Sequence, residues 1–235
     1  MMSRENVPFA EVFPPVFFCI HENIRDFFKK WTDNFYLVKM QLPQRAPPLA
    51  VPPLLCYNPS KEQAGGDFMR KVIVIGSPGA GKSTFSRQLH RLTGLPLYHL
   101  DLLWHKPDRT NVSPEAFDAA LGEILTGDAW IIDGNYGRTL APRLEACDTV
   151  FLLDYPVKVC LAGIRGRIGK KREDMPWVEE ELDPEFQQWV LDFPREQMPQ
   201  VLQLLEEYQD RRTIYRFGSR EEAAAFLAQL ENRSE

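Results

Sequence analysis

Cysteine is scarce in this chain of 235 residues, which contains only Cys19, Cys56, Cys147 and Cys160. No two of them form a C-x-x-C pair, and none stands at a metal-ligand spacing from the four histidines. The sequence therefore indicates neither a disulfide framework nor a zinc site. Scattered, reduced thiols are typical of a cytoplasmic protein.

Long apolar runs are also lacking. No run approaches the roughly 18 residues that are needed to span a bilayer, and the N-terminus shows no basic region followed by an apolar core. We therefore expect a soluble protein that is neither secreted nor held in a membrane.

The chain has no excess of positive charge, because 28 Lys and Arg face 33 Asp and Glu, giving a formal net charge of −5. This balance disfavours DNA or RNA as a partner without excluding it, since a nucleic-acid binder needs a basic face rather than a basic total. A hydrophobic content of 44% is enough to bury a full core, and the length suggests one domain or two.

Residues 1–68 differ from the rest, because they hold nine of the 19 prolines and close with Gly65-Gly66. Proline prevents long helices, so only 24–38 has a plausible helical pattern. We expect a Pro-rich N-terminal extension that is poorly ordered and dispensable, and an upstream start site would explain it. An arm that docks on a partner is the alternative, using Phe17, Phe18, Phe27, Phe28 and Trp31. A compact domain is then expected to span 69–235.

From residue 69 onward, strand-like runs alternate with helical patterns. The expected strands are 71–75, 96–100, 130–133, 149–154 and 213–217, and the expected helices are 82–92, 114–126, 157–168, 184–208 and 220–231. Such alternation predicts an α/β fold of three layers, a five-stranded parallel sheet with helices on both faces. Ser113-Pro114 and the pair Ser219 and Glu222 are typical of helix starts.

The first expected strand runs into a glycine-rich loop, VIVIGSPGAGKST, at 72–84. Four β-branched residues in a row suit a strand buried on both faces. The glycines allow successive N–H groups to surround an anion, and the spacing G-x-x-x-x-G-K-[ST] is that of a P-loop. The predicted nucleotide-binding residues are Gly76, Ser77, Gly79, Ala80, Gly81, Lys82, Ser83 and Thr84. An ordinary Gly-rich turn is the alternative.

Carboxylates end several of these strands, and ligands of open parallel sheets bind beyond the carboxyl ends of the strands. Asp133 closes WIID, and we expect it to hold Mg²⁺ together with the Ser83 hydroxyl. Asp101 closes LPLYHLD and is a candidate for orienting or deprotonating an acceptor hydroxyl, although a helix or turn cap would also explain it. Asp154 is expected to cap the next helix.

A basic segment, RGRIGKKR at 165–172, carries five cations in eight residues of an acidic chain. We expect a lid whose cations close over a triphosphate and offset the charge on the transferred phosphoryl group. A solvated helix end and a contact surface for a nucleic-acid backbone are alternatives. The segment has no cysteine, which excludes a zinc-stapled lid.

From about residue 70 onward the chain resembles the adenylate-kinase-like branch of P-loop kinases, and more closely the group identified as DNA topology modulation proteins. The resemblance rests on IGSPGAGKST, LPLYHLDLLWHKP, WIIDGNYGRTL, TVFLLDYP, RGRIGKKREDM, WVLDFP and TIYRFGSREEAAAFL, in that order. It implies ATP as donor, Mg²⁺ and a short lid. The site residues that it implies are Lys82, Ser83, Asp133, Arg138 on the acceptor side, and the lid arginines Arg165, Arg167 and Arg172.

The acceptor cannot be carried over from better-known relatives. Adenylate kinases have D-G-F-P-R where this chain has DGNYGR, and shikimate kinases have a second aspartate where Leu103 stands here. The short segment 102–128 favours a small acceptor or a compact nucleotide site. Its lining could include Trp104, His105, Lys106 and Arg109, which an ordinary loop explains as well.

The sequence thus predicts an ATP-dependent phosphotransferase acting on a nucleoside, a nucleotide or another small molecule. A nucleotide-dependent regulator acting on DNA is the rival hypothesis. A nucleotide-binding module with slow hydrolysis is a third.

Overall fold

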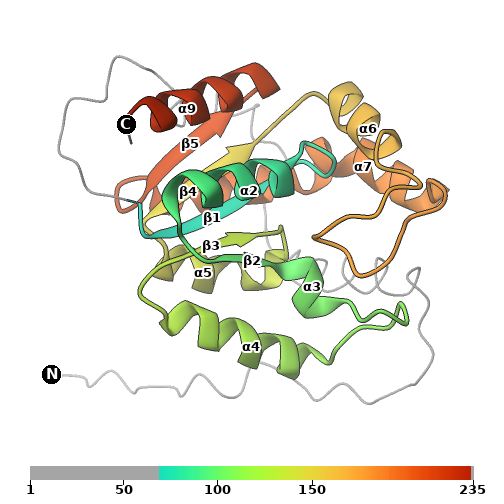
Figure 1. Cartoon of the computed structure of the whole chain (residues 1–235), viewed down its shortest axis with the longest axis horizontal. Coiled ribbons are helices and arrows are strands. Elements are labelled where there is room, and N and C mark those ends of the chain that lie inside the picture. Colours follow the sequence, from blue (N-terminus) through green and yellow to red (C-terminus); the bar gives the residue numbers. More distant parts are fainter. Residues whose placement is uncertain (1–68, 234–235) are drawn as a thin grey trace, which may run out of the picture. The chain divides into compact units, whose positions relative to one another are not determined.

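A computed structural model describes residues 69–233, so the predictions made for 1–68 lie outside the described residues. Five parallel strands form one sheet in the order β2-β3-β1-β4-β5 (Figure 1). The strands are β1 (Lys71–Gly76), β2 (Leu97–His99), β3 (Trp130–Asp133), β4 (Thr149–Leu153) and β5 (Thr213–Phe217). The predicted parallel sheet is therefore confirmed.

Helices cover both faces of this sheet, as its apolar strands require. They are α2 (Lys82–Thr93), α3 (Leu100–Trp104), α4 (Pro114–Thr126), the 3-10 helix η2 (Gly137–Thr139), α5 (Leu140–Ala146), α6 (Val157–Arg165), α7 (Pro184–Glu196), α8 (Met198–Tyr208) and α9 (Arg220–Asn232). None of the helices between residues 69 and 233 is long and apolar enough to cross a membrane.

The alternation of side chains along β1 divides the core into two layers. Val72 and Val74 point into one cluster with apolar residues of α2, α6 and α9. Ile73 and Ile75 point into the other, with apolar residues of α4, α5 and α8. Because both faces are buried, the strand reads as a continuous β-branched run rather than as alternating polar and apolar residues.

The start signals of two helices are confirmed. The Ser113 hydroxyl accepts a hydrogen bond from the Ala116 amide (3.2 Å), and Ser219 accepts one from the Glu222 amide (3.2 Å). In a capping box the Glu222 carboxylate would accept a hydrogen bond from the amide of Ser219. Here it accepts one from the amide of Gly218 instead, at 2.7 Å.

Several predicted bounds were wrong. The helix expected at 184–208 is two helices that meet at Gln197. Pro199 has no amide hydrogen, and its ring would clash with a carbonyl one turn earlier in a continuous helix. The first helix therefore ends before it, and α8 begins at Met198 with Pro199 in its first turn. The helix expected at 157–168 ends at Arg165, and α3, η2 and α5 were not predicted. Asp154 does not cap α6, since its carboxylate pairs with Arg216 of β5 (2.5 Å).

Candidate active site

The glycine-rich loop lies between β1 and α2, at the carboxyl end of the sheet (Figure 1). Gly76, Gly79 and Gly81 have φ angles of 132°, 80° and 98°, a region that residues with a Cβ avoid. A Cβ on Gly76 would stand 2.2 Å from the Leu153 carbonyl oxygen, and one on Gly79 2.3 Å from that of Cys160. The first two glycines therefore let the loop pass close to the neighbouring backbone.

The third glycine has a different surrounding. A Cβ on Gly81 would meet no atom within 4 Å, so open space lies beside this glycine, which directly precedes α2. Within the described part of the chain no side chain caps this helix. Its first amides can therefore bind an anion, which the positive end of the helix dipole also favours.

Lys82 lies inside the loop. Its ammonium group donates hydrogen bonds to the carbonyl oxygens of Gly76 and Ser77, both at 3.1 Å. Burial lowers the pKa of Lys82, and the nearby carboxylates of Asp133 and Asp101 oppose this effect. The structure thus brings the predicted lysine and both predicted aspartates into one electrostatic neighbourhood.

Asn135 holds the start of the loop and was not predicted as a site residue. Its Oδ1 accepts from the Gly76 amide (3.0 Å), and its Nδ2 donates to the Gly76 carbonyl oxygen (2.9 Å). The side chain thus satisfies both main-chain groups where β1 ends. The signal available in the sequence was a side-chain amide two residues after the acidic strand end, in WIIDGNY.

Asp133 ends β3 as predicted, and it is buried. Its Oδ2 pairs with Nδ1 of His99, the last residue of β2, at 2.8 Å. His99 was missed because the strand was expected to continue to residue 100. The strand stops earlier because His99 is in register with Asp133, where β3 ends and Gly134 turns the chain away with φ 138°.

Asp101 therefore lies in the first turn of α3, one residue beyond the end predicted for the strand. It accepts a hydrogen bond from the Tyr136 hydroxyl (2.9 Å) and does not cap the helix. Burial raises the pKa of Asp101, and Asp133 adds to this effect, whereas His105, Tyr136 and Lys82 oppose it. Burial also raises the pKa of Tyr136 well above its ordinary value.

A buried arginine supports the turn that follows β3. Arg143 of α5 donates to the carbonyl oxygens of Gly134 (2.8 Å), Tyr136 (3.1 Å) and Thr139 (3.2 Å), and also to that of Asn135. Burial lowers the pKa of Arg143 to about 10. This side chain fixes the backbone that carries Asn135 and Tyr136, and sequence reasoning did not identify it.

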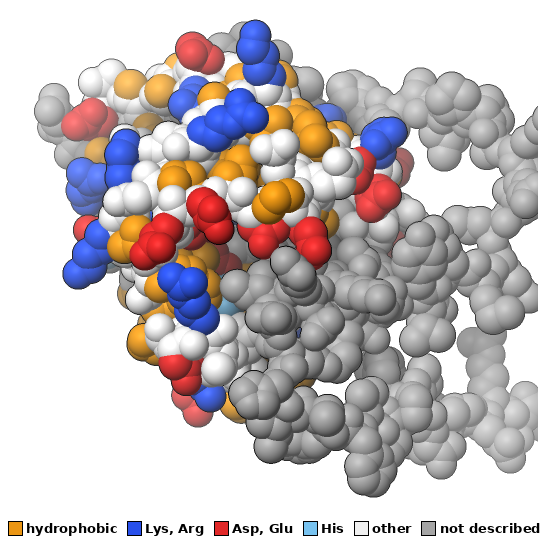
Figure 2. Space-filling view, turned by 90° about the vertical axis from the view of Figure 1, so that its right-hand side faces the viewer, with side chains coloured by type: hydrophobic (Ala, Val, Ile, Leu, Met, Phe, Trp, Pro, Cys, Tyr) orange, Lys and Arg blue, Asp and Glu red, His pale blue; other side chains and the backbone are white. Residues whose placement is uncertain are grey.

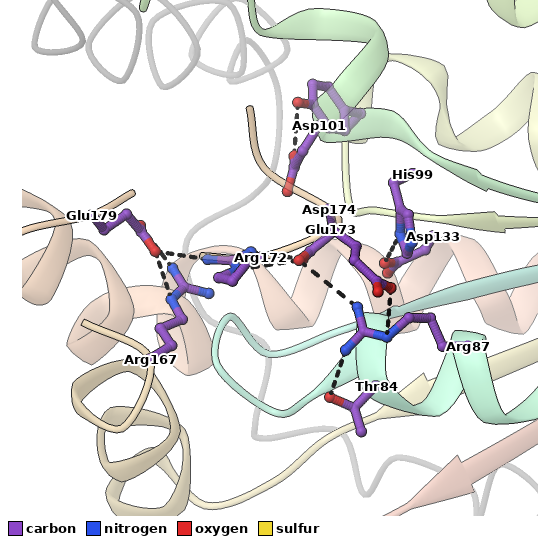
Figure 3. A network of polar contacts seen from close by, with 11 residues as sticks. Thr84, Arg87, His99, Asp101, Asp133, Arg167, Arg172, Glu173, Asp174 and Glu179 are labelled. Carbon is purple, nitrogen blue, oxygen red and sulfur yellow. Dashed lines mark hydrogen bonds and ion pairs between the residues drawn. The ribbon is translucent and has the colours of Figure 1, made fainter. Parts of the chain in front are cut away.

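The lid runs from α6 to α7, and two of its predicted arginines are paired with lid carboxylates (Figure 3). Arg172 binds Asp174 (2.6 Å) and Glu179 (2.7 Å), while Arg167 binds Glu179 (2.9 Å). Although burial opposes it, hydrogen bonds from Arg172 and Ser83 hold the pKa of Asp174 well below its usual range. The lid thus brings a buried carboxylate to Ser83, the serine of the loop that was predicted to bind Mg²⁺.

Two other predicted residues lie elsewhere. Arg138 of η2 forms a two-pronged pair with Asp118 of α4, with distances of 2.6 and 2.7 Å. Arg165 is exposed at the end of α6. In the predicted acceptor segment, Trp104 packs against Phe117 and Tyr136, and the His105 ring contacts Asn111 (2.8 Å) and Trp177. Lys106 and Arg109 are exposed.

The residues present fit a nucleotide with Mg²⁺. The uncapped start of α2 and the open space at Gly81 suit phosphate oxygens. The hydroxyl of Ser83 and the carboxylate of Asp133 are the oxygen ligands that Mg²⁺ prefers, directly or through water. His99 contacts only Oδ2 of Asp133, which leaves Oδ1 for such a water.

No protein-family description matches the chain, and no curated protein is similar to it. Similar solved structures include a shikimate kinase from Acinetobacter baumannii in complex with shikimate, at 20% identity and TM-score 0.43, covering 70% of this chain and 94% of that one. A shikimate kinase from Bacteroides thetaiotaomicron has 16% identity and TM-score 0.42, covering 71% and 98%. A sugar kinase from Janibacter sp. HTCC2649 has 18% identity and TM-score 0.37, covering 71% and 92%.

Fold class follows from the chain's own geometry. The sheet is parallel with the order β2-β3-β1-β4-β5, and the loop after its central strand carries three glycines with positive φ and the half-buried lysine. The acidic end of the neighbouring strand faces that loop. The chain has the α/β fold of a P-loop NTPase.

Proposed function

We propose that this protein is an ATP-dependent phosphotransferase, a P-loop kinase acting on a small molecule. One observation carries the proposal: the half-buried Lys82 lies within the loop, close to the two carboxylates at the carboxyl ends of neighbouring strands. Phosphoryl transfer consists mainly of positioning and charge neutralisation, which such a set of groups supplies.

The loop would bind the donor phosphates. The amides at the start of α2 face the phosphate oxygens, and Lys82 exchanges its two carbonyl partners for the β- and γ-phosphates. Ser83 and Asp133 would hold Mg²⁺, which neutralises phosphate charge when bound. Asn135 keeps the Gly76 carbonyl oxygen paired when the lysine leaves it.

The remaining predicted residues would act on the transferred group and the acceptor. Arg167 and Arg172 neutralise charge on the phosphoryl group after exchanging their carboxylate partners for phosphate oxygens. Asp101 lies beside Lys82 and would orient the acceptor hydroxyl. Arg138 and Arg165 remain predictions of acceptor and lid contacts, and both require a movement of the side chain or of the lid.

Replacing Lys82 with alanine tests this proposal. We expect ADP release to fall about a hundredfold to a thousandfold, since one electrostatic contact to the transferred group is lost. The circular dichroism spectrum should stay unchanged. Lys158→Ala, on the exposed side of α6, is the matched control and should keep its turnover. Undiminished turnover of the Lys82 variant, or no heat from Mg-ATP in calorimetry of the folded protein, would refute the assignment.

The finer family assignment rests on the motifs alone. We propose that the chain is related to the adenylate-kinase-like kinases, and within them to the DNA topology modulation group, because LDLLWHKP and then WIIDGNY follow the P-loop. The same resemblance carries the rival proposal of a regulator on DNA. On the face that bears the lid, acidic and basic side chains are intermixed, which favours the kinase (Figure 2). DNA affinity that falls steeply with salt would favour the regulator.

A further inference from the structure

An open cleft of about 540 Å³ lies beside the loop, between α2, β2 and the lid. Its walls come from these three elements: Arg87, His90 and Arg91 from α2, Leu97 and His99 from β2, and Glu173 from the lid. A cavity of this size suits a small metabolite. The P-loop residues proposed for ATP do not line it.

The lining of this cleft suits an anion. Two arginines and two histidines face one carboxylate. Arg87 is held loosely, at 3.6 Å from Glu173, 3.9 Å from Asp174 and 3.5 Å from the Thr84 hydroxyl. The side chain of Glu173 is 81% exposed, so it can leave Arg87 with little change in its solvation. An anionic ligand could therefore take its place.

The inner end of the cleft adjoins the proposed reaction centre. His99 lines the cleft and pairs through Nδ1 with Asp133, the carboxylate assigned to Mg²⁺ (Figure 3). With Nδ1 engaged, Nε2 is the ring nitrogen left for a ligand. The His99 side chain is only 10% exposed, so its orientation is fixed by its surroundings.

We propose that this cleft binds the phosphoryl acceptor, and that the acceptor is a small hydroxyl compound carrying a phosphate or carboxylate group. The inference rests on the proposed kinase function. Arg87 and Arg91 bind the anionic group, since guanidinium groups match the geometry of both anions. The hydroxyl then lies at the inner end of the cleft, beside His99.

This placement brings the acceptor hydroxyl close to the donor. The hydroxyl oxygen forms a bond to the γ-phosphorus while the bond from that phosphorus to the β,γ-bridging oxygen breaks. ADP leaves with the electron pair, and the hydroxyl proton is released to solvent.

The first test is anion binding, with inorganic phosphate as the probe. The protein is saturated with Mg²⁺ and a non-hydrolysable ATP analogue, and imidazole resonances are followed by NMR. We expect His90 and His99 to shift and His105 to stay unchanged. Arg91→Gln should weaken phosphate binding at least tenfold, whereas Arg195→Gln, on α7 and paired only within its helix, should not. No shift, or equal binding by the Arg91 variant, overturns the inference.

The second test compares turnover with pairs of acceptors, in which each neutral compound is matched with its anionic counterpart. Recognition of a phosphate group is tested by comparing nucleosides with their monophosphates and glycerol with glycerol 3-phosphate. Recognition of a carboxylate group is tested by comparing hydroxy acids with their methyl esters. We expect ADP release only from anionic members. Equal turnover of a neutral member overturns the inference but leaves the kinase proposal intact. Failure of the analogue to bind would refute the kinase proposal. Titration of the analogue-free protein with phosphate would then show whether the cleft binds an anion.

Discussion

Replacing Asn135 with alanine should destabilise the protein and weaken its binding of Mg-ATP. The side chain makes two hydrogen bonds to Gly76, at 3.0 and 2.9 Å, and Gly76 is buried. Two such bonds contribute about 2 kcal/mol, and leaving the buried amide of Gly76 unpaired costs about 1 kcal/mol more. Its carbonyl oxygen keeps Lys82 as a partner, so no further loss arises there. We expect the free energy of unfolding to fall by about 3 kcal/mol.

The same change should act on the nucleotide. When Lys82 moves to the phosphates, the Gly76 carbonyl oxygen of the variant loses its remaining partner. An unpaired buried acceptor costs about 1 to 2 kcal/mol, which corresponds to a Kd for Mg-ATP that rises about fivefold to thirtyfold. Wild type and variant thus differ more with ATP bound than without it.

Urea unfolding and calorimetry measure the two effects. Asn111→Ala is the matched control, because Asn111 also pairs through its side chain, but with His105 rather than with the glycine-rich loop. We expect the control to keep its ATP affinity and to lose no more than about 1 kcal/mol. If the two variants are equally stable and bind Mg-ATP equally well, Asn135 does not support the loop and the reasoning is wrong.

Three further predictions concern packing and ionisation. Gly79→Ala should lower stability by at least about 2 kcal/mol more than Gly169→Ala, as measured by thermal unfolding. Both glycines have positive φ, but only a Cβ on Gly79 would stand 2.3 Å from a carbonyl oxygen, so equal losses would contradict this packing. Folding lowers the pKa of Asp174 from 3.8, so its charge stabilises the fold fully above about pH 5, and this contribution declines as the pH falls below 3.8. Urea unfolding of wild type and Asp174→Asn measures it, and a stability difference that stays constant from pH 7 to pH 3 would disprove this contribution. Burial raises the pKa of Cys147 to about 12, so iodoacetamide at pH 8 should leave this thiol unmodified until the protein unfolds, as peptide mapping would show.

The sequence alone determined the sheet, the loop and the strand carboxylate. A run such as Val72 to Ile75 is typical of a strand that is buried on both faces, as in a parallel sheet, and the glycines after it, at the spacing of a P-loop, favour a tight turn around an anion. These features are local, because each depends on residues adjacent in the chain. Helix starts at Ser113 and Ser219 were predictable for the same reason.

Only the tertiary structure decided which groups meet. That β2 ends at His99 depends on where β3 ends, and the pairing of His99 with Asp133 follows from that register. The bonds of Asn135 to Gly76 join residues 59 positions apart, and Arg167 and Arg172 of the lid pair with lid carboxylates. Such contacts depend on how strands and loops pack in space, and no spacing along the chain encodes them.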